Sequence, residues 1–166
     1  MGDIVFQQME AGYLNGVMEI YNYYVTKTTA TFHAHALTYD EIKELVFFNN
    51  ERYGTFVILN DSRMCGYVSL KQHKTREAYN DTAEVSVYLD PDETGKGLGS
   101  LAVNYIESYA KTKGIHVLIA TICGENEKSI RVFSRNGFFK CAHYKEVGRK
   151  FDQLLDVVAF QKILDK

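Results

Sequence analysis

The stretch AEVSVYLDPDETGKGLGSLAVNYI, residues 83–106, decides the fold because its hydrophobic period changes part-way along. Residues 85–89 alternate between apolar and other side chains, which predicts a β-strand that ends at the Asp-Pro pair 90–91. Apolar residues then recur at helical spacing over residues 98–109. Between the two lies TGKGLG, residues 94–99. The sequence therefore predicts a strand, a glycine-rich loop and a helix in this order.

Such a loop is suited to binding a phosphate-sized anion. Glycines allow backbone N–H groups to turn toward one point, and the first amides of a helix lack internal partners and lie at the positive end of its dipole. The spacing of Gly95, Gly97 and Gly99 fits neither the Rossmann fingerprint nor the P-loop. A tight turn that binds nothing is the alternative interpretation.

Composition and charge restrict the class of protein. At 166 residues, with 46% hydrophobic and 24% charged side chains, the chain has globular values, and we expect a single domain over residues 1–166. A net charge of −2 without a basic run argues against a nucleic-acid partner. Neither a secretory signal nor a run of 18 apolar residues is visible, so we expect no membrane partner and a cytoplasmic location.

Cysteine and histidine usage argues against disulfides and metal sites. Cys65, Cys123 and Cys141 are odd in number and widely spaced, without a C-x-x-C pair, and are expected to be reduced thiols. The five histidines show no ligand spacing with cysteines or carboxylates, so no metal is expected.

The rest of the chain predicts six further strands and three further helices. Residues 26–35 are expected to form a loop, and Thr38 to Glu41 has the form of a capping box. Asn22 is expected to face solvent or to cap a helix, and the apolar run 117–122 is typical of a strand covered on both faces. Strands are predicted at residues 4–9, 55–59, 64–70, 117–122, 138–147 and 154–162, the last two around a turn at 148–152, and helices from residues 13, 39 and 127. This order describes an α/β (α+β) domain with a mixed central sheet flanked by helices on both faces.

The sequence resembles the GNAT acetyltransferase superfamily, specifically its phosphinothricin N-acetyltransferase branch. Gly97, Leu98 and Gly99 match the end of the family's (Gln/Arg)-x-x-Gly-x-(Gly/Ala) loop, although Thr94 stands where Gln or Arg is usual. Further blocks follow in the family's order from about residue 20 to the C-terminus. They are Ile20-Tyr21-Asn22, Thr29-Ala30-Thr31-Phe32, Arg76-Glu77-Ala78-Tyr79, Glu84-Val85-Ser86-Val87-Tyr88, Glu125-Asn126 with Ser129-Ile130, Glu146-Val147-Gly148-Arg149-Lys150-Phe151 and Leu155-Asp156-Val157.

The resemblance implies a GNAT fold and an N-acetyltransferase that uses acetyl-CoA as co-substrate and transfers the acetyl group directly. It implies that the loop holds the coenzyme's diphosphate and that the protein is a homodimer. Asn126 inherits a coenzyme contact, with a helix N-cap as the alternative role. The implied coenzyme-binding residues are Val87, Tyr88, Leu89, Thr94, Gly95, Lys96, Gly97, Leu98, Gly99, Asn126 and Ser129.

Acetyl transfer to an amine requires a base, a donor for the oxyanion and a proton for the leaving thiolate. Glu84 is the candidate base, acting directly or through water, and a strand-end surface carboxylate is the alternative. The backbone N–H of Val87 is the expected oxyanion donor. Phe133 occupies the position where the family has a Tyr or His acid, so we expect water, or the hydroxyl of Ser134, to protonate the thiolate.

The acceptor implied by the resemblance is a small amino-acid analogue such as phosphinothricin, methionine sulfoximine or methionine sulfone. Its expected contacts are Phe32, Arg76, Tyr79, Lys145 and Lys150. Phe32 as a core residue and Arg76 as a surface charge are the alternatives, and the Tyr21, Tyr23 and Tyr24 cluster either closes the core edge or lines the acceptor pocket. Acetylation of a polyamine, aminoglycoside or protein amine, and a non-catalytic acyl-CoA-binding module, also remain open.

Overall fold

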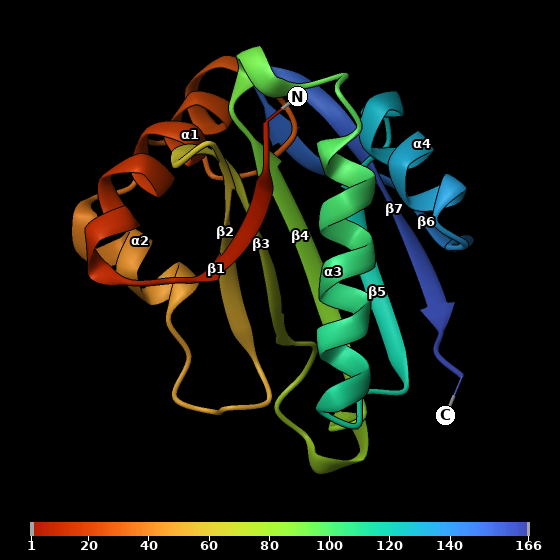
Figure 1. Ribbon diagram of the computed structural model, residues 1–166. Coiled ribbons are helices and arrows are strands. Elements are labelled where there is room, and N and C mark those ends of the chain that lie inside the picture. The colour runs from red at the N-terminus through yellow and green to blue at the C-terminus, as the bar shows by residue number, and fades with distance from the viewer. Residues whose placement is uncertain (1, 166) are drawn as a thin grey trace.

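The computed structural model describes residues 2–165, and its strands and helices follow the predicted order (Figure 1). Met1 and Lys166, which belong to the expected domain, lie outside the described residues. The elements are β1 (Ile4–Gln8), α1 (Leu14–Lys27), α2 (Tyr39–Val46), β2 (Gly54–Asn60), β3 (Arg63–Gln72), β4 (Thr82–Leu89), α3 (Leu98–Thr112), β5 (Val117–Cys123), α4 (Glu127–Arg135), β6 (Phe139–Lys150) and β7 (Gln153–Ile163). Short 3₁₀ turns occupy Ala11–Tyr13, Glu77–Tyr79 and Pro91–Glu93.

One seven-stranded sheet in the order β1-β2-β3-β4-β5-β7-β6 runs through the molecule. Its β4 and β5 are parallel and its other neighbouring strands are antiparallel. Buried residues of α3 and α4 pack on one face of the sheet, and those of α1 and α2 form a second cluster on the other (Figure 1). The predicted GNAT arrangement of a mixed sheet with helices on both faces is confirmed.

The parallel strands at the centre of the sheet separate part-way along. They pair over three positions, which end where Glu84 of β4 lies opposite Ile119 of β5. β4 then continues to Leu89 while β5 continues to Cys123 along β7. Beyond Glu84, backbone groups on the facing edges of β4 and β5 therefore have no partner in the adjacent strand, and they must find one elsewhere.

The glycine-rich loop takes a conformation that requires its glycines. Gly95 and Gly97 have φ of 78° and 84°, in the left-handed region, and Gly97 is the N-cap of α3. A Cβ on Gly99 would lie 3.3 Å from both methyl groups of Val132. The third glycine thus allows the start of α3 to pack closely against α4.

Local capping explains where α2 begins and where α4 ends. The predicted capping box is present, because the Thr38 hydroxyl accepts from the Glu41 amide and the Glu41 carboxylate accepts from the Thr38 amide at 2.7 Å. The Glu41 carboxylate accepts from the Thr38 amide and also from the Thr38 hydroxyl at 3.0 Å, and these two bonds hold the pKa of the Glu41 carboxyl below its usual value. Gly137, with φ of 85°, follows the C-cap of α4 as predicted.

Two predictions near α1 are wrong. The helix continues through Thr26 and Lys27, which were expected in the following loop, because the Thr26 hydroxyl donates to the Asn22 carbonyl and stays within the helix. Asn22 neither faces solvent nor caps the helix. Its side-chain amide donates to the Leu37 carbonyl at 2.9 Å and accepts from the Leu37 amide at 2.8 Å, which fastens the end of the 28–38 loop.

Two predictions about strands also need correction. Residues 148–150 belong to β6, since the chain reverses in a two-residue turn at Phe151 and Asp152, both of which have positive φ. β5 is not covered on both faces: alternate residues such as Leu118 and Ile122 are buried, but Thr121 between them is exposed. Among residues 2–165 no helix is long and apolar enough to cross a membrane.

Candidate active site

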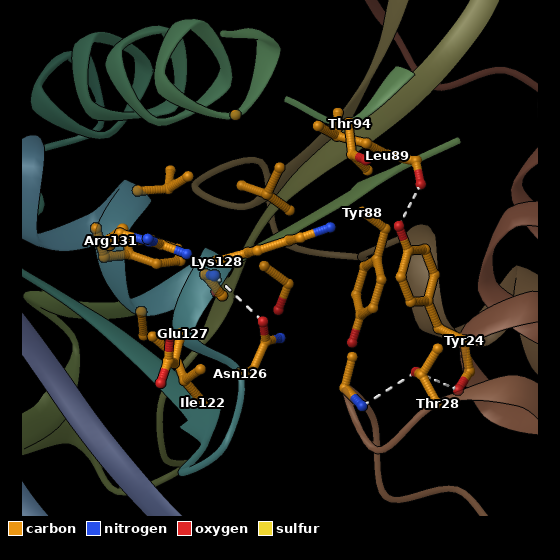
Figure 2. Close-up of a pocket in the computed structure, with 18 of the residues that line it drawn as sticks. Tyr24, Thr28, Tyr88, Leu89, Thr94, Ile122, Asn126, Glu127, Lys128 and Arg131 are labelled. Carbon is orange, nitrogen blue, oxygen red and sulfur yellow. Dashed lines mark hydrogen bonds between the residues drawn. The ribbon is translucent and has the colours of Figure 1, made fainter. Parts of the chain in front are cut away.

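A cavity of about 1060 Å³ opens where β4 and β5 separate, and we call it the central cavity (Figure 2). Its walls come from segments far apart in the sequence. They are Tyr23, Tyr24 and Thr28–Ala30 around the end of α1, residues 85–89 of β4, the glycine-rich loop with Ser100, residues 120–122 of β5, and residues of the segment 125–135 that contains α4. This volume is at the upper end of what small-molecule and cofactor sites use.

The glycine-rich loop forms one end of the central cavity. Thr94, Gly95, Gly97 and Gly99 line it. A Cβ at Gly95 or Gly97 would meet no atom within 4 Å, so open space lies directly over this backbone. The first amides of α3 begin at the same point, and together with the loop they make a cradle for a negatively charged group.

Lys96 and Leu98, also expected at this end, do not line the cavity. Leu98 is buried in the core beneath the loop. The Lys96 ammonium lies 3.0 Å from the Glu93 carboxylate, which is 8% exposed and also pairs with Arg63 at 3.6 Å. Asp90 accepts from the same Arg63 guanidinium at 3.4 Å. These contacts fix the loop from behind.

The segment before and within α4 forms the opposite wall. The Asn126 side chain accepts from the Ser129 amide at 3.2 Å, so Asn126 is an N-cap, and both residues also line the cavity. Lys128, Arg131 and Arg135 line it too, and Figure 2 shows Lys128 extending from α4 across the cavity. The sequence analysis missed these three cations. Their spacing of three and four residues after a helix start was the available signal.

Tyrosines form the wall opposite α4. The Tyr24 hydroxyl donates to the Leu89 carbonyl at 2.6 Å, and burial raises the pKa of Tyr24 to about 12. Tyr88 packs against Tyr24 and Tyr21, with ring centroids 5.6 and 5.1 Å apart. Tyr23 and Tyr24 line the cavity whereas Tyr21 is buried in the core. Tyr21 thus belongs to the core, whereas lining of the acceptor pocket by Tyr23 and Tyr24 stays a prediction.

Glu84 lies at the last paired position of β4 and β5, where the strands begin to separate. Its side chain is 23% exposed and does not line the central cavity, but Ser86, on the same face of β4, does. The Glu84 carboxylate lies 3.4 Å from the Lys71 ammonium and 3.0 Å from Nδ1 of His73. Glu84 is therefore a partly buried, doubly contacted carboxylate rather than a free surface group.

Phe133 and Ser134 lie on different sides of α4. Phe133 is buried, lines the cavity and packs edge-on against Phe138 with centroids 5.0 Å apart. Ser134 is exposed and lies outside the lining. Val87, the expected oxyanion donor, lies beyond the last position at which β4 pairs with β5, and it lines the cavity.

Phe32 and Lys150 meet where the 28–38 loop packs against β6. The Phe32 ring covers Gly148 so closely that a Cβ there would overlap it. Lys150 is only 5% exposed, and its ammonium donates to the Thr31 carbonyl at 2.6 Å. Desolvation lowers the pKa of Lys150. Phe32 thus packs on β6 with 40% of its surface exposed, rather than in the core.

The other acceptor candidates lie in two separate places. Arg76 and Lys74 stack over the Tyr79 ring, 5.9 and 5.1 Å from its centroid, and the His73 ring meets the same ring edge-on. Lys145 pairs with Asp156 at 3.1 Å on the last hairpin. None of the five expected acceptor contacts lines the central cavity.

Comparison with known proteins identifies the family. The acetyltransferase (GNAT) family model matches residues 17–138 of the chain. The chain belongs to the GNAT family. It is a GNAT N-acetyltransferase, and its seven-stranded sheet with four helices is the GNAT fold.

Relatives within the GNAT family resemble the chain over most of its length. It is 29% identical over 155 residues to the phosphinothricin N-acetyltransferase of Streptomyces coelicolor, with 91% of each chain covered. It is 32% identical over 156 residues to the L-methionine sulfoximine/L-methionine sulfone acetyltransferase of Pseudomonas aeruginosa, covering 92% of this chain and 90% of the relative. The crystal structure of a GNAT phosphinothricin acetyltransferase from Sinorhizobium meliloti in complex with acetyl-CoA superposes with a TM-score of 0.92 at 26% identity, covering 97% of this chain and 88% of that one.

The GNAT domain offers no obvious metal centre in its described part. Within residues 2–165, no group of three or more His, Cys, Asp or Glu side chains lies where it could hold a metal ion.

Proposed function

We propose that this GNAT enzyme transfers the acetyl group of acetyl-CoA directly to the amino group of a small amino-acid analogue of the phosphinothricin, methionine sulfoximine or methionine sulfone type. The central cavity is the observation that carries the proposal, because its anion cradle and its unpaired strand edge are the two features that a thioester donor with a diphosphate requires. Relatives named for these substrates, about 30% identical over about 90% of the chain, support the acceptor class.

The residues at the glycine end fit the coenzyme. The open backbone over Gly95 and Gly97 and the first amides of α3 suit a diphosphate, and Asn126 and Ser129 face it across the cavity. Lys128 and Arg131 add two cations to the same cavity without an acidic partner within 4 Å among the described residues. Bound there, acetyl-CoA would supply an acetyl thioester along the edge of β4, beside Val87, Tyr88 and Leu89. Lys96 and Leu98 support the cradle from behind.

Glu84 is the carboxylate on which removal of the ammonium proton depends, directly or through an intermediary. An aliphatic amine with a pKa near ~10.4 is almost fully protonated at neutral pH and cannot attack until it loses a proton. The position of Glu84 at the branch of β4 and β5 supports this role. The Val87 amide, beyond the last paired position, is the proposed donor to the oxygen that becomes negatively charged.

Water is the proposed acid for the leaving thiolate. Phe133 faces the cavity and has no proton to give, and the exposed side chain of Ser134 lies outside the lining, which favours water over the serine hydroxyl. A thiol has a pKa near ~8.5, so its thiolate leaves without a strong acid.

The acceptor's anionic group is proposed to meet Arg76 and Tyr79, in the segment next to Glu84. Lys71 is paired with Glu84, but Lys74 and Arg76 have no acidic partner within 4 Å among the described residues, and their charges favour an anionic acceptor over a polyamine or aminoglycoside. Phe32, Lys145 and Lys150 are proposed to shape the remaining wall.

A homodimer is also proposed, because the last hairpin exposes apolar side chains that a second copy would cover. These are Phe139, Tyr144, Val147, Phe151 and Leu154.

Release of free thiol from acetyl-CoA, measured across a panel of amino-acid analogues and amines, tests the proposal. We expect turnover with phosphinothricin or methionine sulfone and little with spermidine or an aminoglycoside. Calorimetry with coenzyme A runs beside it, and we expect binding. Binding without turnover of any amine would leave only an acyl-CoA-binding module, and the absence of both would overturn the function.

A further inference from the structure

Glu84, at the position where β4 and β5 separate, contacts two nitrogen-bearing side chains. One carboxylate oxygen lies 3.0 Å from Nδ1 of His73 and the other lies 3.4 Å from the Lys71 ammonium. His73 follows directly after β3, and its side chain is 18% exposed. The antiparallel register sets Lys71 directly opposite Glu84, so the fold itself brings both groups to the carboxylate.

These contacts determine which nitrogen of His73 carries the proton. A carboxylate beside a lysine ammonium is ionised at neutral pH, and an ionised carboxylate only accepts hydrogen bonds. Nδ1 of His73 must therefore donate to Glu84, which leaves Nε2 of a neutral imidazole without a hydrogen and free to accept one. A carboxylate that holds Nδ1–H in this way fixes the tautomer and the orientation of the ring, and it offsets the charge that forms on protonation.

The groups around His73 lie on the side proposed for the acceptor. The His73 ring meets the Tyr79 ring edge-on at 5.6 Å, and Lys74 and Arg76 stack over that same Tyr79 ring. The exposed Glu77 lies in the turn Glu77–Tyr79, and β5 contributes the uncharged Ile119 opposite Glu84. The acceptor candidates Arg76 and Tyr79 are therefore associated with His73 rather than with Glu84.

We propose that His73 and Glu84 act as one proton-accepting pair, in which Nε2 of His73 takes the proton from the acceptor's ammonium while Glu84 holds Nδ1–H. This rests on the proposed acetyltransferase function and names the intermediary through which Glu84 acts. One N–H bond of the ammonium breaks and an Nε2–H bond forms, leaving a neutral amine and an imidazolium paired with the carboxylate. After the amine attacks the thioester carbonyl, the nitrogen loses its second proton as the amide forms, and water passes a proton to the leaving thiolate. The imidazolium then returns its own proton to water.

The pH profile of kcat/KM for the variants His73→Asn and His73→Phe tests the pair. An asparagine amide can still donate to Glu84 from near the position of Nδ1 but cannot take up a proton, whereas phenylalanine can do neither. We expect both variants to lose about 100-fold in kcat/KM at neutral pH, the usual order for a general base. The acidic limb of the wild-type profile should disappear in both, because neither side chain can take up a proton. Added imidazole should partly restore turnover in His73→Ala.

Two outcomes would refute the proposed role of the His73–Glu84 pair and leave the proposed acetyltransferase function unaffected. If His73→Asn keeps wild-type kcat/KM and its acidic limb while His73→Phe does not, the imidazole only orients Glu84. If all His73 variants match the wild type, the ring takes no part. The matched control is His116→Asn, at an exposed histidine just before β5, and it should behave as wild type. Coenzyme A affinity by calorimetry shows that each variant is folded, and a wild type inactive with every amine would instead refute the function.

Discussion

The two ends of the site are built in different ways. The glycine end uses backbone amides of one short loop and one helix start, held from behind by Glu93. The acceptor end, around Glu84, uses side chains from β3, β4 and the segment between them, with the 28–38 loop fastened to β6 by Lys150. A backbone cradle depends little on its own side chains, whereas the proposed acceptor end depends on individual side chains. The two ends should therefore respond differently to substitution.

Glu84→Gln should have the largest effect, and it should fall on turnover alone. The amide keeps the size of the side chain but can no longer hold the charge that proton removal requires. We expect kcat/KM to fall by about 10²–10⁴-fold, the range for loss of a general base, with an unchanged Kd for coenzyme A. Thiol-release kinetics and calorimetry measure the two quantities separately.

The matched control for this substitution is Glu77→Gln, an exposed carboxylate in the same connecting segment. It should retain wild-type kinetics. Should Glu84→Gln keep wild-type kcat/KM across the pH range, proton removal would not depend on this carboxylate.

Gly97→Ala should weaken coenzyme binding while leaving the acceptor end intact. Gly97 has φ of 84°, which costs an L-residue about 1–2 kcal/mol, so the free loop should relax away from the cradle and binding must restore it. We expect the Kd for coenzyme A to rise by about tenfold. Gly12→Ala is the control, because Gly12 has no positive φ and a Cβ there meets no atom within 4 Å. Equal affinities for the two variants would argue against a backbone cradle at the loop.

The same contrast explains what the sequence could predict. The glycine-rich loop, the capping box at Thr38 and the N-cap at Asn126 are local patterns, and each is present in the structure. Lys128 and Arg131 could also have been predicted to act together, because their spacing of three residues places them on one face of α4.

Contacts at the acceptor end could not be predicted in this way. The contact of Glu84 with Lys71 depends on the exact register of β3 and β4. A shift of one residue would put the two side chains on opposite faces of the sheet. The bond from Lys150 to the Thr31 carbonyl joins residues 119 positions apart and requires the bulged geometry of β6. Such pairings follow from tertiary structure, and no local pattern near Thr31 or Lys150 indicates them.

Lys128→Gln should weaken coenzyme binding by less than Gly97→Ala does. Its ammonium reaches across the cavity from a partly solvated helix start, where one charge contributes on the order of 1 kcal/mol (Figure 2). We expect the Kd for coenzyme A to rise by roughly fivefold at low salt and less at high salt, because mobile ions screen the interaction. Lys43→Gln, at an exposed position of α2, is the control. A salt-independent loss would indicate a packing effect instead of a charge.

Glu107→Gln should have the smallest effect and should change stability alone. The Glu107 carboxylate on α3 lies 2.6 Å from the Lys162 ammonium, which also donates to the Asn136 carbonyl, and 3.1 Å from Lys111. Burial raises the pKa of Glu107, but the hydrogen bonds from Lys162 and Lys111 outweigh it and hold the pKa below its usual value. A carboxyl whose pKa is lower in the folded state stabilises the protein at pH values above its unfolded-state pKa of about 4.3. This contribution is lost as the pH falls through the folded-state pKa.

Urea unfolding at several pH values measures this contribution. At pH 7 we expect Glu107→Gln to lower the free energy of unfolding by less than about 1 kcal/mol, since exposed ends of the pair are screened by water. The difference from wild type should shrink as the pH falls below about 4 and should vanish below the depressed folded-state pKa, where the carboxyl is protonated in both states. Glu44→Gln, at an exposed position of α2, is the control, and kcat/KM should be unchanged in both variants. A loss of stability that persisted at pH 3 would mean that the Glu107 side chain acts through packing rather than through its charge.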